Sequence, residues 1–249
     1  MKKASSAMTI TSRFLAPAAL LLAVAAGSAV ADQKDSAVFD LTLKGIHAGT
    51  LSISGAIEGR SYAVSGVLKS GGLVALVRKI RYDARAYGTV ADGRFTPSRY
   101  EEDADTGKRQ SQSVMDYKAG VPQVKVYNPP KSPRPGDVDA ATQGGTIDPL
   151  TALYAALRDV PAAEACNQTL ALFDGRRKSQ VVLSDPRPVN GGTACAGEYR
   201  RLEGFSEREM ADKSRFPFTM TYATTGDGRL RVTEISMDTI YGKGRLKRR

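Results

Sequence analysis

The stretch from Leu51 to Ser70, LSISGAIEGRSYAVSGVLKS, alternates apolar and polar residues on both sides of the dipeptide Glu58-Gly59. Side chains on a β-strand point alternately to opposite faces, so each half of this stretch has one apolar and one polar face. A glycine at position 59 can adopt the positive φ that a tight hairpin requires. The stretch therefore predicts two half-buried antiparallel strands joined by a hairpin turn.

The same signals recur along the chain on both sides of this hairpin. Four more turn dipeptides, each an aspartate or threonine followed by glycine, end at Gly93, Gly107, Gly175 and Gly228. Alternation and turns together predict strands at 37–43, 47–57, 60–68, 80–90, 94–103, 108–118, 121–127, 168–173, 176–183, 193–203, 215–224 and 229–240. A dozen strands would strain a flat sheet, so we expect a mainly β fold, with a single large antiparallel sheet curled into an open or closed barrel. A split into a sandwich is the alternative.

Two segments interrupt the strands and provide the one or two short helices that we expect. In residues 71–78, GGLVALVR, the apolar residues do not alternate, which suits a short helix or an apolar loop. Residues 128–145 are rich in Pro and Gly and predict an exposed loop, after which Asp148 can cap a helix that begins at Pro149. One β-rich domain over residues 32–249 explains this pattern, although the loop could also separate two halves.

The first 31 residues have the three parts of a secretory signal peptide. A positively charged start precedes an apolar run at 15–26, and the small residues Ala29 and Ala31 suit a signal peptidase. We expect cleavage after residue 31 and a periplasmic location for the mature chain. No later apolar run reaches the roughly 18 to 20 residues needed to cross a bilayer, so we expect no transmembrane span in the mature chain.

Cys166 and Cys195 are the two cysteines of the chain. In an oxidising compartment a lone pair at this separation is expected to form a disulfide. A redox-active pair is the alternative, but the motif that lowers a thiol pKa places two residues between its cysteines. The spacing therefore favours a structural bond.

The charge of the chain is basic. Removal of residues 1–31 takes away three of the 36 Lys and Arg residues and none of the 26 Asp and Glu residues, which leaves a net charge of +7. The chain has no Trp and few aromatic residues, which argues against a base-stacking groove, so we expect no nucleic-acid partner. The positive charge instead suits an anionic envelope surface or lipid, or it serves solubility alone.

Two segments are candidates for contact with such a partner. Leu73, Val74, Leu76 and Val77 form an apolar run between two glycines and two cations, and they either fill core or form a lip over an apolar cavity or against a membrane. The C-terminal residues 243–249 are expected to form a basic, solvated and mobile tail. Its candidate contacts with an anionic surface are Lys243, Arg245, Lys247, Arg248 and Arg249.

No pattern of catalytic or metal-binding residues emerges. The single histidine, His47, lies between glycines at an expected turn, and one histidine with two disulfide-bonded cysteines makes no His/Cys metal site. The chain lacks the Gly-x-Ser-x-Gly motif that would supply a nucleophile. The acidic residues 101–105 could bind Ca²⁺ or act as paired carboxylates, but they run into a turn and suit a solvated hairpin tip. We expect no cofactor and no enzyme activity, with an unrecognised hydrolase as the alternative.

An ordered set of motifs resembles a known family. The set comprises Gly-x-x-x-Gly at 45–49, Asp-Gly-Arg-Phe-x-Pro-x-x-Tyr at 92–100, Ile-Asp-Pro-Leu-Thr-Ala-Leu-Tyr at 147–154, Phe-Asp-Gly-Arg-Arg at 173–177, and Cys195 followed by Tyr199. Together they resemble a family of exported bacterial proteins catalogued as domain of unknown function 3108, over most of residues 37–240. The resemblance implies an extracytoplasmic, β-rich domain and assigns no catalytic residue.

The expected architecture also looks like that of the periplasmic lipoprotein carriers, in which an incomplete barrel holds acyl chains under a helical lid. Two functions follow from these expectations. The first is a non-enzymatic periplasmic protein that binds or carries a lipophilic or anionic envelope component, with a lipid or lipoprotein as partner. The second is an envelope assembly or scaffold protein that binds another protein or a wall polymer and has a filled core. An apolar interior cavity would favour the carrier.

Overall fold

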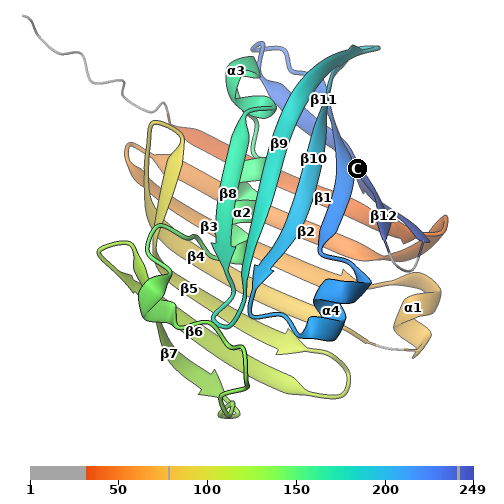
Figure 1. The fold of residues 1–249 in the computed structure, drawn as a ribbon. Coiled ribbons are helices and arrows are strands. Elements are labelled where there is room, and N and C mark those ends of the chain that lie inside the picture. Colours follow the sequence, from red (N-terminus) through yellow and green to blue (C-terminus); the bar gives the residue numbers. More distant parts are fainter. Residues whose placement is uncertain (1–31, 78, 240–241) are drawn as a thin grey trace, which may run out of the picture.

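The computed structural model describes residues 32–77, 79–239 and 242–249, and these form one antiparallel sheet of thirteen strands (Figure 1). The strands are β1 (Gln33–Leu43), β2 (Ile46–Glu58), β3 (Ser61–Ser70), β4 (Arg81–Ala91), β5 (Arg94–Asp105), β6 (Gln110–Lys118), β7 (Val121–Asn128), β8 (Gln168–Phe173), β9 (Lys178–Val189), β10 (Gly192–Glu203), β11 (Arg215–Thr224), β12 (Leu230–Thr239) and β13 (Gly242–Arg248). The helices are α1 (Gly72–Val77), α2 (Pro149–Leu157), α3 (Ala162–Ala165) and α4 (Glu207–Asp212), with the 3-10 turn η1 (Ala140–Thr142).

The strand order is β7-β6-β5-β4-β3-β2-β1-β13-β12-β11-β10-β9-β8, so the first and second halves of the chain meet where β1 pairs with β13. The sheet curls, and its two end strands, β7 and β8, are not paired with each other (Figure 1). The predicted fold class, a single large antiparallel sheet curled into an open or closed barrel, is confirmed in its open form. The expected signal peptide lies outside the described residues.

The prediction of a mobile C-terminal tail is wrong, because residues 242–248 form β13 inside the sheet. Cations at 243, 245 and 247 point to the outer face, while Gly244 is buried and Leu246 packs against the core. The chain therefore alternates with period two here as well. The alternation is hidden in the sequence because charged residues occupy the outer positions and the inner ones include a glycine.

Helix α2 fills the concave side of the sheet (Figure 1). It packs on β3, β4, β5 and β8, and two glycines make room for it on the sheet. A Cβ at Gly55 would come within 2.6 Å of the Tyr154 ring, and one at Gly66 within 2.7 Å of Leu150. Both glycines occupy inward positions of the predicted hairpin of residues 51–70. The core that results is continuous from β1 to β12 and includes Phe39, Ile57, Tyr154, Phe173, Tyr222 and Val232.

The short helices lie at the ends of the strands. α3 precedes β8 and α4 joins β10 to β11, and neither was expected from the sequence. α1 replaces a tight turn between β3 and β4 and protrudes at one end of the sheet (Figure 1). None of the helices in the described ranges is both long enough and apolar enough to cross a membrane.

Candidate functional site

The base of α1 is held by hydrogen bonds to the sheet. Ser70 N–H donates to the Ile80 carbonyl at 2.9 Å, and Ile80 N–H donates back to the Ser70 hydroxyl at 2.9 Å. Gly71 N–H donates to the Ala48 carbonyl of β2 at 2.9 Å. Gly72 has a φ of +54°, and a Cβ there would lie 2.5 Å from the His47 carbonyl oxygen, so the chain enters α1 through a position that only glycine suits.

The apolar residues of α1 face solvent. Leu73 is 64%, Leu76 82% and Val77 90% exposed, whereas Val74 is half-buried. The alternative that this run fills core is therefore wrong for three of its four residues. Large exposed apolar residues that are contiguous, rather than scattered singly, are typical of interaction surfaces.

Three cations and one anion, Asp105, lie beside α1. A surface hollow of about 770 Å³ separates α1 from the β5–β6 turn, and its lining includes Leu76, Val77, Lys79, Lys108 and Arg109. Within the part of the chain that the structure describes, these three cations form no ion pair. The tip of α1 thus combines exposed apolar side chains with unpaired positive charge, and we call this set (Leu73, Leu76, Val77, Lys79, Lys108 and Arg109) the α1 tip.

The concave side of the sheet contains a buried polar network at the start of α2. Asp148 caps α2, as predicted from the sequence, and the structure shows in addition that it is completely buried. Its carboxylate accepts hydrogen bonds from Thr151 N–H at 2.8 Å and from the Thr151 hydroxyl at 2.6 Å. Burial raises the pKa of Asp148 from 3.8 to about 6, against the opposing effect of the bonds from Thr151. The Tyr62 hydroxyl lies 2.8 Å from the Thr151 hydroxyl and extends the network to β3.

A second pocket, of about 750 Å³, lies where the ends of the curled sheet approach each other. Its walls are the β4–β5 turn, the β6–β7 turn, α3 and the start of β8, and its floor includes Ala155 and Arg158 at the end of α2. We call this the seam pocket. It was not predicted from the sequence, because the pocket is formed by segments up to 79 residues apart that only the curl of the sheet brings together.

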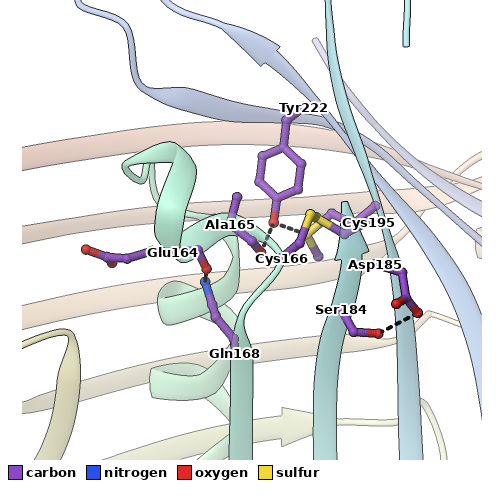
Figure 2. The surroundings of a disulfide bond; sticks show 9 residues. Glu164, Ala165, Cys166, Gln168, Ser184, Asp185, Cys195 and Tyr222 are labelled. Atoms are coloured by element: carbon purple, nitrogen blue, oxygen red, sulfur yellow. Dashed lines mark hydrogen bonds between the residues drawn. A yellow bond between two sulfur atoms is a disulfide. The ribbon is translucent and has the colours of Figure 1, made fainter. Parts of the chain in front are cut away.

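The two cysteines form a disulfide that fixes the start of β8, as expected from the sequence (Figure 2). Cys166 ends α3, Cys195 is buried in β10, and their Cα atoms are 5.3 Å apart. Beside the bond, the Tyr222 hydroxyl donates to the Ala165 carbonyl at 3.2 Å (Figure 2). The segment that leads into β8 is thereby attached to strands on the other side of β9.

The cations of residues 243–249 are largely paired with acidic residues of the neighbouring strands, which corrects the expectation of a free basic tail. Arg249 lies 2.7 Å from Asp40 of β1, Arg245 3.8 Å from Glu234 and Lys243 3.9 Å from Asp238, both of β12. Arg248 points to the inner side, over the Phe39 ring. Lys247 is flanked by Asp40 on one side and Glu234 on the other. The outer face of β13 is therefore close to electrically balanced.

The remaining candidates from the sequence do not form a reactive site. His47 lies in β2 rather than in the turn, and its Nδ1 is 3.9 Å from Asp40. Glu101 and Glu102 lie within β5 rather than at a hairpin tip. In β5, Glu101 forms an ion pair with Arg99, and Glu102 accepts a hydrogen bond from the Tyr100 hydroxyl. Among the described residues there is no group of three or more His, Cys, Asp or Glu placed to hold a metal ion.

Comparison with known proteins points to one family. The family model described as "Protein of unknown function (DUF3108)" matches residues 38–186, which include the motifs at 92–100 and 147–154. Comparison with the curated proteins gives no match. Among solved structures the chain is similar to a beta-barrel-like protein of domain of unknown function DUF1849 from Brucella abortus, with 16% identity and a TM-score of 0.47, over 86% of this chain and 94% of that chain.

Proposed function

The chain belongs to the DUF3108 family, and because the function of that family is unknown, we propose from the chain's own geometry that it is an exported, non-enzymatic envelope protein that attaches to an anionic lipid surface through the α1 tip. The disulfide supports an oxidising compartment, and the sequence of residues 1–31 supports export to the periplasm.

The exposure of Leu73, Leu76 and Val77 is the observation that carries the proposal. Moving a large aliphatic side chain fully from water into an apolar phase is worth about 1.5–3 kcal/mol, so even partial insertion of three such side chains favours attachment. Each cation close to an anionic leaflet adds about 1 kcal/mol, and Lys79, Lys108 and Arg109 lie where the headgroups would be. Apolar insertion and charge attraction thus act on the same end of the molecule.

The fixed base of α1 supports the same proposal. Because Ser70, Gly71 and Ile80 are hydrogen bonded to one another or to the sheet, the apolar side chains are presented without an ordering step. Preorganised surfaces bind with a smaller entropic cost than segments that must fold on contact.

The filled interior bears on the kind of lipid contact. A carrier that encloses acyl chains needs an apolar cavity. In the described part of the chain, α2 and the core residues occupy much of the concave side, and the seam pocket has four charged residues in its lining. We therefore place the lipid contact at the surface. The filled interior also suits the alternative function, an assembly or scaffold protein whose α1 tip binds another protein.

Vesicle co-sedimentation tests the proposal. We expect the protein to bind phosphatidylcholine vesicles that contain phosphatidylglycerol, and to bind pure phosphatidylcholine vesicles at least tenfold more weakly. The triple variant Leu73→Ser, Leu76→Ser and Val77→Ser should bind the anionic vesicles at least tenfold more weakly, which corresponds to only about 1.4 kcal/mol. Since the three side chains are exposed, the melting temperature should stay within a few degrees of that of the unaltered protein.

The matched control removes three exposed aliphatic side chains elsewhere, through Val126→Ser, Val189→Ser and Leu202→Ser. It should leave vesicle binding unchanged. A second variant tests the contribution of charge. It combines Lys79→Gln, Lys108→Gln and Arg109→Gln and should bind the anionic vesicles more weakly, whereas Lys118→Gln, at the opposite end of the sheet, should not. Equal binding by the α1 triple variant and its control would contradict attachment through α1 and favour the scaffold function.

A further inference from the structure

We propose that the free edge of β8 in the seam pocket is a docking site for an extended polypeptide segment, which adds to the sheet as a further strand. β8 is the last strand of the sheet and pairs with β9 along one edge. Along the C-terminal half of its other edge a short parallel segment is already bound. Ile147 N–H donates to the Ala171 carbonyl at 2.9 Å, and Phe173 N–H donates to the Ile147 carbonyl at 3.0 Å.

The N-terminal half of that edge is unpaired. The N–H and C=O groups of one strand residue point to the same side, and the side reverses with each residue. Because the Ala171 carbonyl and the Phe173 N–H point away from β9, the Ala171 N–H and both backbone groups of Thr169 point away from it too. The described residues give these three groups no hydrogen-bond partner, and Thr169 is exposed. They form the pattern of donors and acceptors that β-strand addition uses.

The space beside this edge is large enough for a short strand. The seam pocket of about 750 Å³ is lined on one side by residues 167–171 and on the other by residues 92–97 and 119–120. A strand rises about 3.3 Å per residue, so four residues span about 13 Å. Residues 145–147 also line the pocket, and an added strand would continue beyond them along the same edge of β8.

The charges of the pocket do not select an ionic ligand. Its lining contains two cations, Arg94 and Arg158, and two anions, Asp92 and Glu164. Arg158 is already bonded to Glu164 at 2.7 Å. Recognition therefore rests on the main chain of the peptide rather than on the charge of its side chains. This inference does not depend on the proposed attachment to lipid.

NMR titration with two matched peptides tests the inference. The probe is a capped nine-residue peptide, KTVTVTVTK, which can extend and offer backbone N–H groups. The control peptide, KPPPPPPPK, has proline at all seven inner positions and therefore offers no backbone N–H group there. With the first peptide at millimolar concentration, we expect saturable shifts of the Thr169 and Ala171 amide signals and at least fivefold slower hydrogen exchange at both, with no such changes from the control.

Two substitutions separate main-chain from side-chain recognition. Thr169→Pro removes the outward N–H without removing a bond to β9, and it should weaken peptide binding at least tenfold, whereas Thr169→Ala keeps the N–H and should bind within twofold of the unaltered protein. If Thr169→Pro does not fold, the wild-type titration with the two peptides decides. Unchanged Thr169 and Ala171 amides, equal effects of both peptides, or shifts centred on β7 would each overturn the proposal.

Discussion

At the scale of single residues, Asp148 combines a structural role with an electrostatic cost. It caps α2 through the backbone N–H of Thr151, and it is completely buried. Burial disfavours the charged carboxylate, so its pKa rises from 3.8 to about 6. In the pH range between those two values the folded protein holds a proton that the unfolded chain has lost. The contribution of Asp148 to stability is therefore greatest below pH 4 and falls as the pH rises through about 6.

Asp148→Asn isolates this effect. Asparagine caps a helix about as well as aspartate but carries no charge, so the variant should lack this part of the pH dependence. The free energy of unfolding of the unaltered protein, relative to that of the variant, should fall by about 1–3 kcal/mol between pH 4 and pH 7, since one pKa unit corresponds to 1.36 kcal/mol. Urea unfolding at both pH values measures it. If the difference in unfolding free energy between the two proteins is constant, or grows with pH, the pKa of Asp148 is not raised in the folded protein.

At the scale of elements, β13 has the largest consequence for stability. It lies between β1 and β12, and its backbone connects the two halves of the sheet. Deletion of residues 243–249 should therefore abolish cooperative unfolding, because two interior strands would lose their partners. A mobile tail would be removed with no change in melting temperature. Circular dichroism melts of the full and shortened proteins distinguish the two outcomes.

The elements also show what the sequence can and cannot predict. Twelve strands and α2 are visible in the sequence, because one apolar face per strand produces period two and Asp148-Pro149 marks a helix start. β13 was missed because charged residues cover its outer face, and α3 and α4 because four to six residues are too few for a helical period. The sequence also left open whether residues 73–77 are buried. An apolar run has the same composition in a core as on a surface, and contacts with distant strands decide between them.

At the scale of the whole molecule, the two proposed surfaces lie at opposite ends of the strands. In an antiparallel meander successive connections alternate between the two ends. α1 and the β5–β6 turn therefore share one end, while the β4–β5 and β6–β7 turns, which line the seam pocket, share the other. A molecule attached to a lipid surface through α1 would hold the free edge of β8 away from it. The seam pocket itself could not be predicted from the sequence, because it depends on how far the sheet curls.

The central claim is that the α1 tip enters an anionic lipid surface, and the lack of tryptophan in the chain allows a direct measurement of it. Leu76→Trp places a single tryptophan at the most protruding leucine of α1, and Val126→Trp places one on β7 as a control. With vesicles that contain phosphatidylglycerol, we expect the emission of the Leu76→Trp protein to shift to shorter wavelength and to be quenched by brominated lipid, while that of Val126→Trp stays unchanged. No shift at position 76, or an equal shift at both positions, would contradict attachment through α1.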